Sequence, residues 1–503
     1  MARWGQNSAP AGATAVFGAD QVPAVPTPVS YSRAGIFYLD DTGRQIDTAT
    51  PGGHLSSVNL DERGNTVRML TAGNREAALN ASPTDTAEQE AALAQQLDSH
   101  QVYDAAGVLL LESFGPTRPV KIGAVVLAAR EHTVNSYDQG APAAGGPFRL
   151  LTTSTTGAWR DGQPDSQTRS TSTAYDWVLR LPVKVTTDAV AGGLNLSTLT
   201  GYDPVTGLVV SSSLPGAGGL ATADPETTST TYFSAAANAS YPGCGSRPEW
   251  ANLVCRVGPA GQIAGSALAK LPAKYLTYDR LNAVEVMTET DDTSTPATVL
   301  RTTTTSYDAA GRPVGSELSS SVPGVAVAAS ATVYDPATGL VVKTQAVSGG
   351  AVLSQVVRGF DSLGQQVSYT DSLGQQSTTS YDLLGRPSVS DDGKATQSRS
   401  YATEGPGSDP RGLLTSLTDS QAGTWLVGYD ANGAATSVGY PGGLSALTTF
   451  DATGSPTALR YTLVGGSGCG SNCELYGEDV IDNVHGQQGL SSSLCVKVLG
   501  GLG

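Results

Sequence analysis

Apolar residues along this chain occur in short runs separated by Gly, Pro, Asn and Asp. The longest apolar run covers Ile122 to Ala129. Segments such as Gln375 to Tyr381 and Ala446 to Phe450 are rich in Thr and Ser and end in an aromatic residue. Such segments fit a pleated, half-exposed surface. Short runs bounded by turn residues therefore predict many short strands.

One stretch, Asp85 to Ser99, has the composition of a helix instead. Thr84 or Asp85 can cap its first turn, and only Leu93 and Leu97 mark an apolar stripe. We therefore predict a short helical insertion over residues 85–99 that packs on the surface of the sheet.

A short pattern recurs along the chain: an aromatic residue, Asp, two variable residues and Gly. Copies begin at Tyr103, Tyr307, Phe360, Tyr381, Tyr429 and Phe450, longer copies begin at Tyr202 and Tyr334, and a weaker relative covers Tyr38 to Gly43. From Tyr278 onward the aromatic positions are 20 to 29 residues apart, with a second turn signal such as Asp371 to Gly374 between them. Each period therefore predicts two turns and two strands. Tyr401 is followed by Ala402, so we expect that copy to have lost its turn.

The residue types explain the turn. Asp at its first position accepts hydrogen bonds from backbone N–H groups, and Gly adopts the positive φ that reverses the chain. The recurring tyrosines are expected to stack into an aromatic ladder. The residues predicted to build the repeat turns are Tyr307, Asp308, Gly311, Tyr334, Asp335, Gly339, Phe360, Asp361, Gly364, Asp371, Gly374, Tyr381, Asp382, Gly385, Tyr429, Asp430, Gly433, Phe450, Asp451 and Gly454.

The predicted fold is all-β. About two dozen strands at a spacing of about 4.8 Å would make a sheet over roughly 100 Å long, and open sheets of that size curl or close. We expect repeated antiparallel hairpins in a large curved sheet or partial β-shell. The predicted regions are a flexible leader rich in Ala, Gly and Pro (1–30), a divergent repeat region with the helical insertion (31–270), a regular repeat region (271–461), and an irregular tail with Gly and Cys (462–503).

The units Tyr307 to Pro313, Tyr381 to Pro387 and Asp371 to Asp382 resemble the YD repeat of the Rhs family. The resemblance covers Tyr278 to Tyr461 well and Tyr31 to Val210 more loosely. It implies a hollow β-shell that encloses a C-terminal toxin, as in bacterial Rhs proteins and the similar insecticidal toxin complexes. The toxin and the core segment of the family are expected to be absent from this chain, which would then be a fragment of the shell.

Rhs proteins often carry an Asp-Pro-x-Gly-Leu signature linked to self-cleavage. The segments Asp203 to Leu208 and Asp335 to Leu340 are similar to it but contain one additional residue, and both follow Tyr in the repeat register. We interpret them as ordinary turns, so self-cleavage is not predicted.

Candidate chemistry is sparse in the sequence. None of the four histidines lies in a triad pattern or a metal-binding pattern, and phosphate-binding loops are lacking. We therefore expect no enzyme activity, cofactor or metal. Cys244 and Cys255 bracket a loop with Pro and Gly, and they are either a disulfide or two buried thiols. In the tail, Cys469, Cys473, His485 and Cys495 are four potential zinc ligands, but their spacing fits no strong signature; the alternative is an irregular or disulfide-linked tail.

Charge and hydropathy limit the classes of partner that we expect for this chain. The formal net charge is −16, and clustered Lys and Arg for phosphate contacts are lacking, which excludes nucleic acid as an expected partner. The apolar runs are too short for a membrane span. Residues 1–29 show no signal peptide, so a secreted or cell-surface protein would use an upstream signal or a dedicated secretion machine.

Three functions are compatible with the sequence. The leading one is a non-enzymatic scaffold whose partner is a toxin passenger domain. The alternative is a cell-surface adhesin that binds carbohydrate on target cells through Trp159, Trp177, Trp250 and Trp425. A glycosidase would require two carboxylates that converge in the irregular regions.

Overall fold

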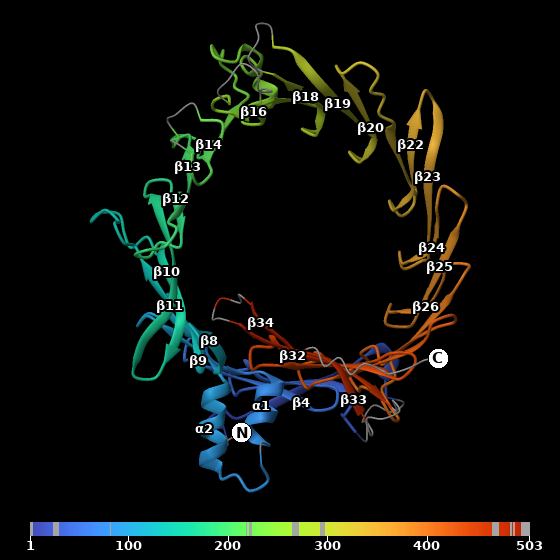
Figure 1. Cartoon of the computed structure of the whole chain (residues 1–503). Helices are drawn as coiled ribbons and strands as arrows, with labels where there is room; N and C mark the ends of the chain where they lie inside the picture. Colours follow the sequence, from blue (N-terminus) through green and yellow to red (C-terminus); the bar gives the residue numbers. More distant parts are fainter. Residues whose placement is uncertain are drawn as a thin grey trace. The chain divides into compact units, whose positions relative to one another are not determined.

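The computed structural model describes residues 4–23, 30–80, 82–217, 219–220, 224–263, 271–291, 297–464, 472–482, 485 and 488–493. These residues form antiparallel strands and two α-helices, so the predicted all-β fold of repeated hairpins is confirmed (Figure 1). The chain divides into two compact units, each described here by itself. Unit 1 comprises Met1–Ser136, Ser154–Arg169 and Thr379–Gly503, and unit 2 comprises Tyr137–Thr153 and Ser170–Thr378.

The elements follow one another along the chain mainly as hairpins. The N-terminal part contains β1 (Gly12–Phe17), β2 (Ala34–Leu39), β3 (Gln45–Thr50), β4 (His54–Leu60), β5 (Thr66–Leu70), α1 (Ala72–Leu79), α2 (Ala87–Leu97), β6 (Ser99–Tyr103), β7 (Leu110–Phe114), β8 (Arg118–Ile122), β9 (Val125–Tyr137), β10 (Leu151–Arg160) and β11 (Gln163–Asp176). The middle contains β12 (Leu181–Thr187), β13 (Leu196–Tyr202), β14 (Val209–Ser213), β15 (Thr227–Tyr232), β16 (Val254–Pro259), β17 (Ala273–Tyr278), β18 (Val284–Thr290), β19 (Val299–Tyr307), β20 (Pro313–Ser320), β21 (Ala329–Tyr334), β22 (Val341–Ser348), β23 (Ala351–Phe360), β24 (Gln366–Thr370) and β25 (Gln376–Tyr381). The C-terminal part contains β26 (Pro387–Asp391), β27 (Thr396–Ser400), β28 (Ser416–Asp419), β29 (Gly423–Tyr429), β30 (Ala435–Gly439), β31 (Leu444–Phe450), β32 (Pro456–Val464), β33 (Asn472–Asp482) and β34 (Gln488–Ser493).

Of the flexible leader predicted for residues 1–30, the structure describes residues 4–23 and 30, and parts of residues 4–23 are packed or paired. Trp4 is 1% exposed and packs in a core with Leu70, Leu79 and Ala94. Strand β1 pairs antiparallel with β2 along its whole length. The buried Trp4 indole and the pairing of β1 with β2 hold this segment in unit 1.

The helical insertion is shorter than predicted and has a companion. Helix α2 begins after Thr86, whose side chain accepts from the Gln89 N–H while the Gln89 side chain accepts from the Thr86 N–H, which is a capping box. Thr86 therefore caps the helix in place of Thr84 or Asp85. Helix α1 was not predicted, because it contains Gly73 and Asn74, which disfavour a helix, and shows little apolar periodicity.

The C-terminal tail also differs from its predicted irregular form. Strand β33 pairs antiparallel with β32, and β34 pairs with β33, so hairpin pairing continues past residue 462. Cys469 and Cys495 lie outside the described residues.

Candidate functional site

The repeat turns are the feature that recurs most regularly in this structure, and the turn at Asp308 shows how they are built. The backbone N–H groups of Ala310 and Arg312 each donate to the Asp308 Oδ1 at 2.9 Å. The Gly311 N–H donates to the Asp308 carbonyl oxygen at 2.9 Å, and Gly311 has φ 76°. The strand register shifts between Ser306 and Tyr307. A tight turn closed by a left-handed Gly with a bulge beside it is a common hairpin closure.

The predicted turn residues occupy the same geometry in the other copies. The turn glycines 311, 339, 364, 374, 385, 433 and 454 have φ between 73° and 86°. Backbone N–H groups donate to the carboxylates of Asp335, Asp361, Asp371, Asp382, Asp430 and Asp451. In the longer turn of Asp335, the Thr338 hydroxyl and N–H donate to Oδ1 as well.

These hydrogen bonds favour the charged carboxylates. The Arg312 side chain and N–H hold the pKa of Asp308 below its ordinary value. The Thr338 N–H and hydroxyl lower the pKa of Asp335 in the same way. At Asp40, burial raises the pKa, but donation from Thr42 and Arg44 outweighs it and brings the pKa down to about 2. The turn carboxylates therefore serve backbone capping.

Tyrosine hydroxyls link each hairpin to the preceding one. In eight copies the hydroxyl donates to the carbonyl oxygen of the residue two positions after the left-handed residue that closes the preceding turn. These bonds are 2.8–3.1 Å long and join Tyr175 to Leu151, Tyr202 to Pro182, Tyr232 to Val209, Tyr278 to Val254, Tyr307 to Val284, Tyr334 to Pro313, Tyr401 to Pro387 and Tyr429 to Leu414. Because the acceptor always lies in the preceding repeat, the tyrosine hydroxyl connects two consecutive repeats.

The ring contacts differ from the predicted aromatic ladder. The Arg312 guanidinium lies over the Tyr334 ring at 4.4 Å, and the Arg386 guanidinium lies over the Tyr401 ring at 4.3 Å. Arg386 also donates to the Gly412 carbonyl of the next turn at 2.8 Å. The arginine that follows the turn Gly therefore connects one repeat to the next.

Sequence analysis missed several copies of the turn. Tyr175-Asp176 begins one, but Arg180, with φ 59°, stands where most other copies have Gly. The turn predicted to be lost after Tyr401 is present: the Asp409 N–H donates to the Ala402 carbonyl, and the Gly412 N–H donates to the Asp409 carbonyl. Residues 402–408 are an insertion, so the search for adjacent Tyr and Asp failed there.

Cys244 and Cys255 form a disulfide with an S–S distance of 1.99 Å in unit 2. Both are buried, and they belong to a cluster with Phe233 and Tyr278, against which Trp250 packs. Residues 233–253 stand where other repeats have a short turn, because the Phe233 N–H donates to the Leu253 carbonyl and Asn252 has φ 68°. The disulfide thus staples an enlarged repeat turn.

A search against models of known protein families finds no match, and a search of curated proteins finds none either. Solved structures do match. A chain of the Photorhabdus luminescens Tc holotoxin pore is 12% identical, with 92% of this chain and 26% of that chain covered and a TM-score of 0.28. A crystal structure of TcdB2-TccC3 without its hypervariable C-terminal region is 14% identical, with coverages of 96% and 26% and a TM-score of 0.27. This chain thus spans about a quarter of the length of those chains.

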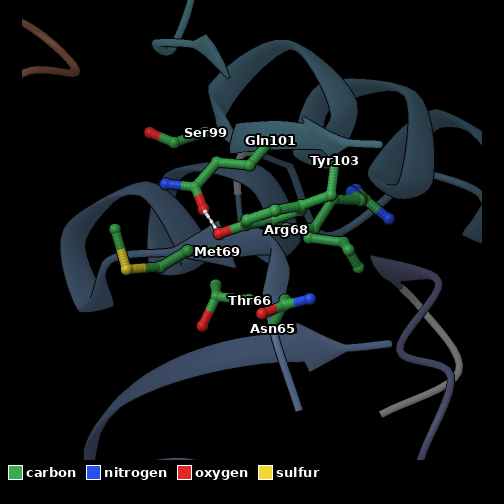
Figure 2. A pocket seen from close by; sticks show the side chains of 8 residues that line it. Asn65, Thr66, Arg68, Met69, Ser99, Gln101 and Tyr103 are labelled. Carbon is green, nitrogen blue, oxygen red and sulfur yellow. Dashed lines mark hydrogen bonds between the residues drawn. The ribbon is translucent and has the colours of Figure 1, made fainter. Parts of the chain in front are cut away.

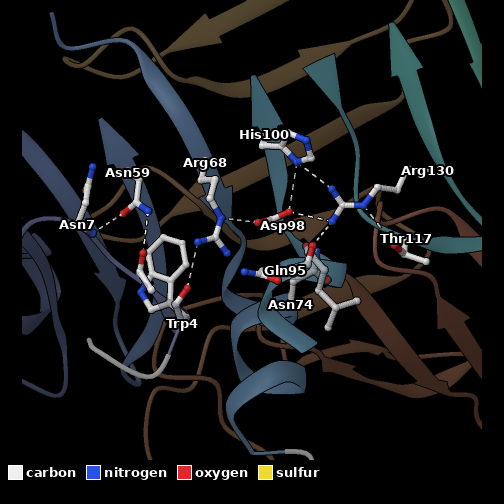
Figure 3. Close-up of polar contacts among 12 residues, drawn as sticks. Trp4, Asn7, Asn59, Arg68, Asn74, Gln95, Asp98, His100, Thr117 and Arg130 are labelled. Carbon is white, nitrogen blue, oxygen red and sulfur yellow. Dashed lines mark hydrogen bonds and ion pairs between the residues drawn. The ribbon is translucent and has the colours of Figure 1, made fainter. Parts of the chain in front are cut away.

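One polar cluster of unit 1 is centred on Asp98. The Asp98 carboxylate accepts from Arg68 Nε at 2.5 Å and from an Arg130 guanidinium N–H at 2.8 Å, and it lies 3.6 Å from His100 Nδ1 (Figure 3). Burial raises the pKa of Asp98, but these partners outweigh it and lower the pKa. Since Asp98 follows α2, the cluster ties that helix to the neighbouring strands.

A shallow hollow of about 450 Å³ lies beside β5 and β6. Arg68, Gln101 and Tyr103 are among its lining residues, and the Tyr103 hydroxyl donates to Gln101 (Figure 2). Within the described part of the chain, no group of three His, Cys, Asp or Glu side chains is arranged to hold a metal, and no helix is long and apolar enough to cross a bilayer.

The four tryptophans named for carbohydrate binding are all half-buried. Trp159 packs edge-on against Phe114 at 5.5 Å, and Trp177 packs against Phe148 at 5.0 Å. Packing against neighbouring rings occupies surface that a stacked sugar would need.

Proposed function

We propose that this chain is a non-enzymatic scaffold, a length of repeat sheet that encloses or displays a passenger protein. The observation that carries this proposal is the link between consecutive hairpins. Tyrosine hydroxyls and arginine side chains reach from one repeat to the next, as at Tyr334 and Arg386. Residues that contact the next repeat join the repeats into one extended surface. Repeat proteins commonly provide such a surface.

The use of the acidic residues supports a structural role. The best-defined carboxylates, such as Asp308 and Asp382, accept from backbone N–H groups and from the arginine four residues later. A catalytic acid or base needs a pKa near the working pH, whereas the pKa values of these two groups are lowered. They are suited to hold turns and poorly suited to transfer protons.

The proposed passenger is a toxin domain, since the repeats resemble the YD repeats of the Rhs family. The chain would act outside the cell that makes it, and a disulfide between Cys244 and Cys255 fits an oxidising compartment.

A protease-protection experiment tests the proposal. The DNA around the gene is sequenced to identify a neighbouring or continuous reading frame for a passenger, and the passenger is produced alone and together with this chain. We expect the passenger to survive protease at least about ten times longer with the chain, because enclosure hides its cleavage sites. Protection should fall when Asp308 and Asp335 are both replaced by Ala, which opens two turns. Equal digestion with and without the chain, or reproducible micromolar binding on a glycan array, would overturn the scaffold proposal.

A further inference from the structure

The N-terminal segment and the last repeats belong to the same compact unit although more than 240 positions separate residue 136 from residue 379. Strand β8 contacts β33, although β8 ends at Ile122 and β33 begins at Asn472. This contact joins parts of the chain that hairpin formation between neighbouring strands does not bring together.

The N-terminal residues contact the turns of the last repeats one after another. Asp20 pairs with Arg386 of the Asp382 turn at 3.2 Å, Arg33 pairs with Glu404 in the insertion before Asp409, the Gly73 N–H donates to Asn432 Oδ1 of the Asp430 turn at 2.7 Å, and Asn74 Nδ2 donates to the Ala452 carbonyl of the Asp451 turn at 2.8 Å. These contacts reach, in chain order, the Asp382 turn, the insertion before the Asp409 turn, the Asp430 turn and the Asp451 turn. We name the N-terminal residues of these contacts, together with Arg118, the clasp.

The turn at Asp451 receives the most buried of these contacts. Its Oδ1 accepts from the N–H groups of Thr453 and Ser455. Its Oδ2 lies 3.4 Å from the Arg118 guanidinium, and the two side chains are only 4% and 6% exposed. The partner of this carboxylate oxygen therefore comes from β8, 333 positions away.

Comparison with other turns shows why a distant arginine fits here. In the turns of Asp308 and Asp382, Oδ2 is paired by the arginine four residues later, Arg312 or Arg386. Asp451 has Ser455 at that position, so its turn does not supply its own arginine. Arg118 stands in for the missing repeat arginine.

We propose that the clasp recognises the last repeats through the chemistry of their turns, and that Arg118 docks at Asp451 because this turn has no arginine four residues after its Asp. Burying both charges is costly unless they meet, so a turn with its own arginine would compete with Arg118. The lack of an arginine four residues after Asp451 is therefore a condition for docking, which the turn at Asp382 does not meet. This inference does not depend on the proposed scaffold function.

The substitution Ser455→Arg tests this docking by giving the turn an arginine in the position used at Asp308. We expect the new arginine to compete with Arg118 and hydrogen exchange of the α1 amides in the full chain to become at least about tenfold faster. The matched control is Gln365→Arg, which places an arginine at the same position of the Asp361 turn in unit 2 and should leave α1 exchange unchanged.

A second variant disrupts the clasp from its other side. A Cβ at Gly73 would lie 2.5 Å from Asn432 Nδ2, whereas a Cβ at Gly12 has nothing within 4 Å. Gly73→Leu should therefore displace the Asn432 side chain and speed exchange in residues 429–434, and Gly12→Leu should not. Unchanged α1 exchange in Ser455→Arg, or unchanged exchange of residues 429–434 in Gly73→Leu, would overturn the proposal. So would an equal rise in the hairpin of residues 307–320 in unit 2, because it would report general loosening.

Discussion

At the scale of single residues, the repeat depends on three tasks. Asp caps the turn, a left-handed residue closes it, and the Tyr hydroxyl donates to the preceding repeat. Of the three positions, the left-handed one tolerates the widest range of residue types, since Asn282 and Arg180 occupy it with φ 62° and 59°. Gly is favoured there because it lacks a Cβ, but the carboxylate bonds and the strand register hold other residues in the same conformation.

The tyrosine bond can be tested by removing one hydroxyl. Tyr334→Phe deletes the donor to the Pro313 carbonyl and keeps the ring beneath Arg312. We expect a local loss of about 1 kcal/mol, the usual net contribution of a hydrogen bond. Native-state hydrogen exchange of β20 and β21 would measure it. Tyr369→Phe in the neighbouring repeat is the control, and an equal effect of both variants would contradict a special role for Tyr334.

The capping carboxylates predict a pH dependence of stability. The pKa of Asp40 is about 2 in the folded chain, below its unfolded value of roughly 3.9. A group with a lowered folded pKa contributes stability above the unfolded pKa, and that contribution is lost as the pH falls through the folded pKa. The urea midpoint should therefore fall between about pH 4 and pH 2. Asp40→Asn should lower the midpoint at pH 7 and flatten this decline, whereas Asp41→Asn, on an exposed neighbour, should leave the profile unchanged.

At the scale of elements, the sequence predicted the short hairpins well and the insertions poorly. Asp-to-Gly turns at fixed spacing are local signals, so the turns at Asp308, Asp361 and Asp382 were placed from residue types. The turn after Tyr401 was missed because seven residues, 402–408, separate Tyr401 from Asp409. The burial of Trp4 in the core of unit 1 and the ion pair between Arg118 and Asp451 were also missed. Contacts between residues so far apart in the sequence leave no local pattern.

The stapled turn in unit 2 makes a prediction of its own. Cys244 and Cys255 are 11 residues apart, and closing a loop of that length stabilises by up to about 3 kcal/mol. Cys244→Ser should therefore make residues 233–253 susceptible to limited proteolysis, with cleavage products mapped by mass spectrometry. The turn of Asp308 should stay intact in the same digest. If residues 233–253 resisted the protease equally in variant and parent, the staple would contribute nothing to this turn.

At the scale of the whole molecule, each unit has its own buried cluster. Leu79 packs with Trp4 and Leu70 in unit 1, and Phe233 packs with Tyr278 beside the disulfide in unit 2. Contacts within a repeat protein connect neighbours, so stability is a sum of local contributions and regions with separate clusters can unfold separately. The tyrosine and arginine contacts between neighbouring repeats are also local, and they occur along each unit.

Calorimetry of the full chain should therefore show two transitions. Leu79→Ala should cost about 3 kcal/mol through the cavity it leaves and lower one transition by about 6 to 12 °C. Cys244→Ser should lower the other transition, because its cluster lies in unit 2. Combining the two substitutions should shift both transitions by the same amounts as the single variants, since distant sites add. A single transition lowered by either substitution would show that the two clusters unfold together, and stability would then be a property of the entire chain.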